Sequence, residues 1–227
     1  MSLIRVERQG PVRTVILDRP DKRNALTDEM MVEIRDLFTA EPAQDERVTV
    51  IRGEGPSFCA GLELSTGGVD PAAAQLIETM FDAVQRYPLP TVARVQGAAV
   101  AGGCELALHC DFAVAATDAR FVMPLAQIGV ATTWFLTKKI MEAAGPVIGR
   151  EFLLLGDPLS GERLAGLGVI ARAVEAAELD AEVTRITERL AANAPLSLKA
   201  MKGLILAQMS VYDLPERGAA AKLADDV

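Results

Sequence analysis

The sequence predicts one α/β domain, and three observations carry this prediction. Segments with strand patterning alternate with segments of helical periodicity, in the repeated order strand, loop, helix. The chain has 227 residues and is 50% hydrophobic, which is enough to bury one substantial core. No linker-like stretch marks a second domain. The repeated order indicates crossover units that build a largely parallel sheet.

Composition excludes several classes of function. The formal net charge of −8 argues against a nucleic-acid surface, because phosphate binding needs clustered Lys and Arg. The amino terminus lacks a signal-peptide pattern, and no uncharged apolar run reaches the roughly 18 residues of a membrane span, so we expect no membrane partner. Cys59, Cys104 and Cys110 lie in apolar surroundings without CxxC spacing, which predicts buried reduced thiols and a cytoplasmic protein. No cluster has metal-ligand spacing, so no metal is expected.

A β-hairpin is predicted at the start of the chain. Alternating segments at residues 3–7 and 12–17 flank Gln9-Gly10-Pro11, which is favourable turn chemistry. These two strands should therefore be antiparallel.

A loop at residues 18–26 separates the hairpin from the first helix. Thr27 or Asp28 can cap that helix, because apolar residues recur at helical spacing after them. The loop carries three cations. They are either ordinary solvated charges or contacts to a phosphorylated ligand.

Residues 48–52 predict a buried strand, followed by a loop of glycine and small residues at 53–64. Residues 65–70 resemble a mobile connection. Pro71 suits the first turn of the next helix, and Pro88-Leu89-Pro90 ends it.

The most specific stretch of the chain is residues 95–108. It is typical of a strand that stops in a run of tiny residues and restarts as an apolar helix at about Gly103, with Glu105 in the first turn. Tiny residues let the backbone approach a ligand, and the unpaired N–H groups of a helix start stabilise an oxyanion. Close packing of a helix on a sheet also uses small residues, so the stretch alone leaves both interpretations open.

The second half of the chain is predicted to be mainly helical. Residues 111–115 and 121–123 are short strand candidates, and the pattern from Thr133 onward is helical with glycine and proline punctuation. Residues 154–170 are expected to fold back on the core.

Five motifs, in order, resemble those of the crotonase superfamily, also called the enoyl-CoA hydratase/isomerase family. They occupy residues 19–26, 58–64, 96–107, 110–111 and 165–170. The resemblance extends from about residue 3 to residue 205. It implies an α/β crotonase-like spiral of ββα turns, with residues 1–195 as the spiral core and 196–227 as a helical trimerisation region.

The resemblance also implies partners and a ligand. Chains of this family form homotrimers, often paired into hexamers, and bind an acyl-CoA or enoyl-CoA thioester, as in fatty acid metabolism. Coenzyme A would enter as part of the substrate, with no separate cofactor. By resemblance, the coenzyme A moiety lies along five residues: Lys22, Arg23, Ala25, Leu26 and Ala60.

The same resemblance assigns an oxyanion hole to the backbone N–H groups of Leu62 and Gly102. A thioester lowers the barrier to an enolate, and each donor aimed at the developing charge is worth about 2.7–4 kcal/mol. Leu62 suits this role because only its backbone is used.

Glu105 stands where family hydratases have one catalytic glutamate. An acid at a helix start can also serve only as a cap. The helix dipole favours the ionised form of Glu105 and burial opposes it, so the sequence does not determine the direction of its pKa shift. The second hydratase glutamate, after Pro124, is replaced by Leu125. Leucine can neither hold a water molecule by a hydrogen bond nor donate a proton, so the sequence does not support hydration by two carboxylates. An isomerase reaction that uses the same glutamate is equally unsupported. Hydration by Glu105 alone should be slow.

The glycine-rich turn that usually follows is also absent. Trp134, the only tryptophan, stands there as either a core residue or a wall of the acyl pocket. Gln127, Thr132 and Thr133 are the polar groups left nearby to orient a substrate or a water. The nucleophilic aspartate of family dehalogenases has no counterpart. His109, the only histidine, is expected in the core or at an interface.

Two hypotheses from different classes follow. The first is a crotonase-type enzyme that forms an oxyanion-stabilised enolate, with Glu105 as its single acid/base. The second is a non-catalytic acyl-CoA binding or carrier protein of the same fold, which Leu125 favours. A dinucleotide-binding enzyme is a weaker third hypothesis, because Gly97, Gly102 and Gly103 do not make GxGxxG.

Overall fold

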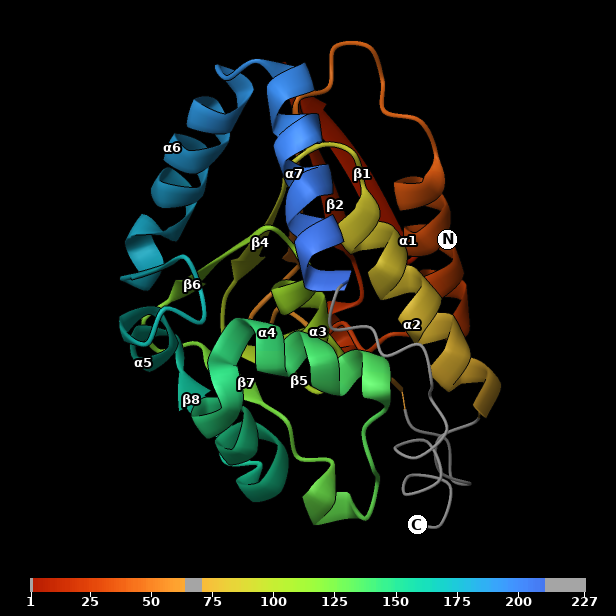
Figure 1. Ribbon diagram of the computed structural model, residues 1–227, viewed down its shortest axis with the longest axis vertical. Helices are drawn as coiled ribbons and strands as arrows, with labels where there is room; N and C mark the ends of the chain where they lie inside the picture. The colour runs from red at the N-terminus through yellow and green to blue at the C-terminus, as the bar shows by residue number, and fades with distance from the viewer. Residues whose placement is uncertain (1, 64–70, 211–227) are drawn as a thin grey trace.

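A six-stranded sheet forms the centre of the protein (Figure 1). The structure is a computed structural model, and it describes residues 2–63 and 71–210. The predicted loop at 65–70 and the end of the predicted trimerisation region, 211–227, lie outside the described residues. The strands, in their spatial order, are β1 (Ile4–Gln9), β2 (Val12–Leu17), β3 (Val48–Gly53), β4 (Thr91–Val95), β6 (Phe112–Ala116) and β9 (Arg172–Val174).

Strand directions in this sheet follow the sequence prediction. β1 and β2 form the expected antiparallel hairpin, with Ile4 opposite Leu17. Each later neighbouring pair is parallel, from β2·β3 to β6·β9. The hairpin and the largely parallel arrangement are therefore confirmed.

A second, three-stranded sheet has the order β5-β7-β8. Its strands are β5 (Ala98–Val100), β7 (Arg120–Val122) and β8 (Leu159–Ser160). The predicted loop of tiny residues before Gly103 is thus partly wrong, because β5 pairs in parallel with β7. The mainly helical prediction after Thr133 is confirmed, but it missed β8 and β9, because strands of two or three residues are too short to show alternation.

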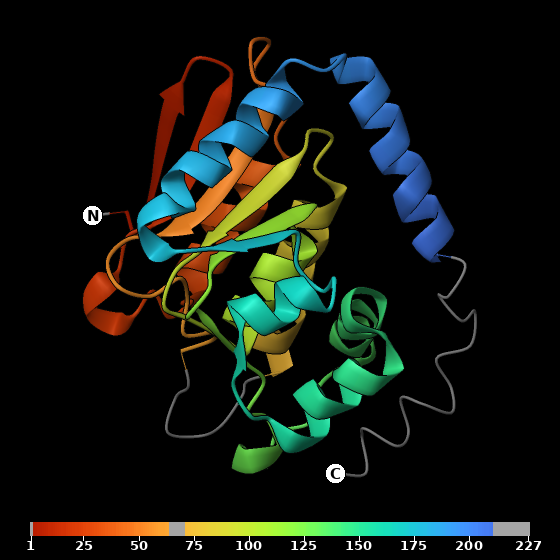
Figure 2. The same cartoon turned by 90° about the vertical axis from the view of Figure 1, so that its left-hand side faces the viewer.

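Seven α-helices occur in the described ranges: α1 (Asp28–Thr39), α2 (Pro71–Arg86), α3 (Gly102–His109), α4 (Trp134–Arg150), α5 (Gly161–Gly166), α6 (Leu179–Ala191) and α7 (Pro195–Ser210). Short turns of 3-10 or π type occupy η1 (Pro20–Lys22), η2 (Ala126–Ile128), η3 (Glu151–Leu155) and η4 (Ala176–Glu178). Thr27 caps α1 as predicted, because its hydroxyl accepts a hydrogen bond of 3.3 Å from Met30 N–H. α1 and α2 pack together on one side of the sheet, and α6 lies on the opposite side (Figures 1 and 2).

The short helix α3 is the most enclosed element of the fold. It contacts α2, α4 and strands β4, β5 and β6. Every residue from Gly103 to His109 is buried, including the charged Glu105. This packing places the start of α3 at the meeting point of the two sheets.

Helix α7 leans away from the rest of the molecule (Figure 2). Lys202 ties it to the body: its Nζ donates to Leu89 O at 3.1 Å and to Asp111 Oδ2 at 2.6 Å. Large apolar side chains along the helix remain exposed: Leu196, Met201, Leu204 and Ile205. The helix begins at Pro195, and the predicted division after residue 195 stays a prediction. No helix in the described ranges has the length and hydropathy to span a membrane.

Candidate functional site

A cavity of about 170 Å³ opens beside the start of α3. Its walls come from the loop after β3, from α2, from α3 and from residues 123–136. Most lining residues are apolar. The polar side chains on its wall are those of Glu105, Thr132 and Thr133. An apolar cavity with few polar groups is typical of a small-molecule site.

Two backbone loops meet at one end of this cavity. Leu62 pairs with Leu26 and Cys59 pairs with Ala99 through isolated parallel bridges. A Cβ at Gly61, whose φ is +86°, would lie 2.6 Å from Val100 O and 3.1 Å from Gly102 N. Only glycine permits this approach, which brings the amides of residues 62 and 102 together.

The amides of Leu62 and Gly102 are the two predicted oxyanion donors. Both residues line the cavity, and neither N–H group donates to a backbone or side-chain acceptor in the described ranges. Gly102 is the first residue of α3, so its N–H group has no acceptor within the helix. The site therefore presents two backbone donors without a partner among the described residues, with the positive end of a helix dipole behind one of them.

Ala101 makes the turn from β5 into α3 in a strained backbone conformation. Its φ is +46° and its ψ is −112°, a region that side-chain-bearing residues rarely adopt. Hydrogen bonds on both sides hold it there: Ala101 N donates to Val122 O at 2.7 Å, and Glu105 N donates to Ala101 O at 3.0 Å. Such strain costs on the order of 1–3 kcal/mol and is typical of functional sites.

Glu105 is the buried acid of the cavity. Its residue is 1% exposed, and neither carboxyl oxygen has a hydrogen-bond partner in the described ranges. Burial raises the pKa of Glu105 well above its usual value, against a smaller lowering by the charge of Lys139. The direction of the pKa shift, which the sequence left open, is thus decided by desolvation.

His109 lies one turn further along α3 and is a core residue, as expected. Its ring is stacked between Phe81 and Phe135, with centroid separations of 4.8 and 5.3 Å. Burial, helped by the charge of Lys139, lowers the pKa of His109 to about 3. The neutral ring therefore makes no ion pair with the Glu105 carboxyl, whose Oε2 is 3.6 Å from Nδ1.

The predicted coenzyme A loop lies beside the same end of the cavity. Lys22 and Arg23 are exposed, and Ala60 N donates to Arg23 O at 2.9 Å. Ala60 lines the cavity, and Ala25 is partly buried next to the loop. The side chain of Leu26 instead lies in the core, at 0% exposure, so this residue reaches the site only through its backbone.

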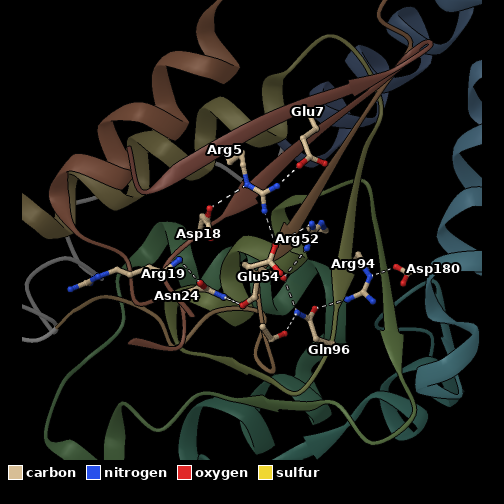
Figure 3. Close-up of polar contacts among 12 residues, drawn as sticks. Arg5, Glu7, Asp18, Arg19, Asn24, Arg52, Glu54, Arg94, Gln96 and Asp180 are labelled. Carbon is tan, nitrogen blue, oxygen red and sulfur yellow. Dashed lines mark hydrogen bonds and ion pairs between the residues drawn. The ribbon is translucent and has the colours of Figure 1, made fainter. Parts of the chain in front are cut away.

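Asn24 fixes that loop, a structural role that the sequence did not predict. Its Nδ2 donates to the carbonyls of Glu54, Ser57 and Phe58 at 2.9, 2.9 and 3.2 Å, and its Oδ1 accepts from Arg19 N at 2.9 Å (Figure 3). Asn24 is buried and has a φ of +57°, which asparagine tolerates better than most residues. The sequence signal for this role was an asparagine inside a predicted loop, because asparagine side chains often bond to the backbone of turns.

An ion pair joins the loop at residues 18–26 to the loop that carries Leu62. Arg19 Nη1 and Nη2 each donate at 2.9 Å to one carboxyl oxygen of Glu63, the residue after Leu62. Arg19 Nη1 also donates to Ala25 O at 3.2 Å. The arginine hydrogen bond lowers the pKa of Glu63. This pair was not predicted, because its partners are far apart in the sequence.

Leu125 and Trp134 differ in their relation to the cavity. Leu125 lines it, as expected. In the described ranges Glu105 is the only carboxylic acid on its wall. Trp134 does not line it; the residue begins α4 and is 44% exposed, so the core interpretation is also not supported.

The three nearby polar residues are distinguished by their hydrogen bonds. Gln127 Nε2 donates to Leu155 O at 2.9 Å, outside the cavity lining. Thr133 Oγ1 caps α4 by accepting from Leu136 N at 3.3 Å. Thr132 Oγ1 is buried without a partner in the described ranges.

The described residues contain no group of three His, Cys, Asp or Glu side chains that could hold a metal ion. Cys59, Cys104 and Cys110 are free and buried, in agreement with the sequence prediction. Burial raises the pKa of Cys59 and Cys110 to about 12, so these thiols stay protonated.

Comparisons with known proteins find relatives along most of the chain. The sequence family described as enoyl-CoA hydratase/isomerase matches residues 7–224. The chain is 32% identical over 216 residues to a putative enoyl-CoA hydratase from Thermus thermophilus, covering 90% of this chain and 84% of that protein. It is 30% identical over 207 residues to 2,3-dehydroadipyl-CoA hydratase from Escherichia coli, covering 89% and 81%. A crystal structure of an enoyl-CoA hydratase/carnithine racemase from Magnetospirillum magneticum superposes with a TM-score of 0.87 at 30% identity, covering 99% of this chain and 86% of that one.

Proposed function

The chain belongs to the enoyl-CoA hydratase/isomerase family, the crotonase superfamily, and on this premise we propose that it acts on an acyl-CoA or enoyl-CoA thioester in the cavity beside α3. The observation that carries this proposal is the pair of unsatisfied backbone donors, Leu62 N–H and Gly102 N–H, at the same cavity as the buried Glu105. This arrangement suits a reaction in which negative charge develops on one oxygen atom.

The thioester carbonyl oxygen would accept hydrogen bonds from both amides. When the carbonyl becomes an enolate, its charge grows and both bonds strengthen, at about 2.7–4 kcal/mol for each donor. The loops that carry the two donors are held by the Leu26–Leu62 and Cys59–Ala99 β-bridges and by the close approach of Gly61 to the backbone of residues 100–102. Little reorganisation is therefore needed as the charge develops.

Glu105 would be the single acid/base of the reaction. Burial raises its pKa above that of an ordinary glutamate, which makes the carboxylate a stronger base toward a proton of the substrate. It is three residues after Gly102 on the same rigid helix, so the position of the acid relative to that donor is set by helix geometry.

The coenzyme A moiety would lie along Lys22, Arg23, Ala25 and Ala60. Two exposed cations match its phosphates, and the hydrogen bond between Ala60 and Arg23 joins this loop to the cavity. Coenzyme A would be part of the substrate, and the proposal includes no further cofactor.

The assembly would be a homotrimer or a hexamer made of two trimers, with residues 196–227 as the trimerisation region. The exposed apolar side chains of α7 support this, because Leu196 is 81% and Leu204 is 67% exposed in the single chain. Three free buried thiols support a cytoplasmic location.

A non-catalytic acyl-CoA carrier is the alternative, and Leu125 on the cavity wall is the observation that favours it. Exchange of the C2 protons of acyl-CoA in D2O, followed by mass spectrometry, separates the two functions. An enzyme exchanges these protons and Glu105→Gln loses the exchange. Binding of acyl-CoA in isothermal titration without any exchange would favour the carrier, and no binding of acyl-CoA or free coenzyme A would contradict both.

A further inference from the structure

Thr132 lines the same cavity as Glu105. Thr132 Oγ1 is buried and makes no hydrogen bond to the described residues, although Thr132 is on the cavity wall. Both carboxyl oxygens of Glu105 are also buried without a hydrogen-bond partner among the described residues. A buried polar atom without a partner is uncommon, and three of them at one cavity indicate a ligand atom that completes their hydrogen bonds.

The two groups come from different walls. Glu105 belongs to α3, and Thr132 belongs to the segment between η2 and α4. The neighbouring candidates are already occupied, since Gln127 bonds to Leu155 O and Thr133 caps α4. Apart from Glu105, Thr132 is therefore the polar side chain on the cavity wall that has no hydrogen-bond partner among the described residues.

We propose that Thr132 and Glu105 together bind the oxygen atom that is added to, or leaves from, C3 of the acyl chain. This rests on the proposed function, and it gives the cavity a narrower ligand class: a 2-enoyl thioester with a water, or the corresponding 3-hydroxyacyl thioester. The Thr132 hydroxyl accepts one O–H of the water, and the ionised Glu105 accepts the other.

The proposed step balances with one carboxylate. As the water oxygen bonds to C3, its proton passes to Glu105, and the C2–C3 π pair moves toward the thioester. The charge on the thioester oxygen is held by Leu62 N–H and Gly102 N–H. The enolate then takes the proton at C2 from Glu105, which is ionised again, so one water has been added. Dehydration follows the same path in reverse.

In this proposal Thr132 binds the oxygen atom and Glu105 makes both proton transfers, so the reaction needs no carboxylate at position 125. A threonine hydroxyl holds an oxygen atom but does not ionise in the working pH range. The proton must therefore make both transfers through Glu105, and both directions begin with that group ionised. The rate should therefore rise with pH as Glu105 ionises. It should not fall again at higher pH through the ionisation of a second acid on the cavity wall.

The test compares two reactions in the same protein. Dehydration of 3-hydroxybutyryl-CoA requires a bound C3 oxygen, whereas exchange of the C2 protons of butyryl-CoA in D2O does not. Thr132→Val removes the hydroxyl with little change in shape. We expect it to lower dehydration at least ten-fold relative to exchange, and Thr132→Ser to restore most of the loss. Thr137→Val, on α4 outside the cavity lining, is the matched control and should leave the ratio unchanged.

The outcomes separate this inference from the proposed function. A dehydration-to-exchange ratio that is the same in Thr132→Val and the wild type would overturn the role of Thr132. Exchange by the wild type without any dehydration would also overturn it, while the proposed function would stand. Failure of the wild type to exchange any acyl-CoA would overturn both.

Discussion

His109 Nδ1 and the backbone carbonyl of Glu105 are joined by a hydrogen bond of 2.8 Å, one turn apart on α3. A carbonyl oxygen only accepts, so Nδ1 carries the proton of the neutral ring. The catalytic candidate and the only histidine of the chain thus share one buried turn, and their pKa values move in opposite directions.

Stability should fall in acid because of His109. Its pKa is about 3 in the folded protein against 6.5 unfolded, so the unfolded chain binds the extra proton. The free energy of unfolding should therefore decrease as pH falls from 6.5 toward 3, by at most about 1.4 kcal/mol per pH unit from this group. Urea unfolding at several pH values should show a shallower acid loss in His109→Phe, which keeps an aromatic ring between Phe81 and Phe135. Equal slopes in the two proteins would contradict the buried neutral histidine.

Glu105→Gln should have opposite effects on activity and on stability. Turnover should fall roughly 10²–10⁴-fold, the usual loss for a positioned acid/base. The pKa of Glu105 is raised above 4.5 in the folded protein, so the wild type binds more protons when folded and loses stability as pH rises above 4.5. The glutamine variant lacks this loss and should gain stability relative to wild type from pH 5 to pH 8. Full activity in the variant would show that another residue is the acid/base of the reaction.

Leu125→Glu should restore part of a two-carboxylate site. We expect the wild type to hydrate crotonyl-CoA below the usual enzyme range of about 1–10³ per second, because one carboxyl makes both proton transfers. The variant should be faster and should acquire a bell-shaped pH profile. The gain should be small, because the new carboxyl enters an apolar wall and is partly desolvated. Rapid hydration by the wild type would show that Leu125 is not the position that limits this reaction.

The Arg19–Glu63 pair should position the Leu62 amide. Glu63→Gln weakens the two 2.9 Å contacts, and we expect a several-fold loss of kcat for the thioester. Thermal stability should change little, because Glu63 is exposed and solvent screens its charge. Arg35→Gln, which removes a surface ion pair with Asp36 away from the cavity, is the control. A stability loss with unchanged kcat would indicate a purely structural pair.

Helix α7 should carry the subunit contacts. Leu204→Asp places a charge among exposed apolar residues and should shift the assembly toward smaller species in light scattering. Glu188→Gln on α6, which lies outside that surface, should leave the assembly unchanged. A wild-type protein that is monomeric at all concentrations would contradict the trimer proposal.

Local interactions explain which parts of the fold were predictable. The β1–β2 hairpin, the Thr27 cap of α1 and the helix beginning near Gly103 depend on turn chemistry, capping and periodicity, and they agree with the structure. Strands β5, β8 and β9 depend instead on their neighbours, because two or three residues form a strand only when a partner strand lies beside them.

The sequence by itself determined the fold class, the family motifs and the identity of Glu105 as the acid at the helix start. Only the tertiary structure decided that burial raises the pKa of that acid, because the helices packed around α3 exclude water from it. It also decided which of the three nearby polar residues remains available, since Gln127 and Thr133 have hydrogen-bond partners and Thr132 has none within residues 2–63 and 71–210. Desolvation and hydrogen-bond competition are sums over neighbours that are distant in the chain, so the linear pattern of residues does not contain them.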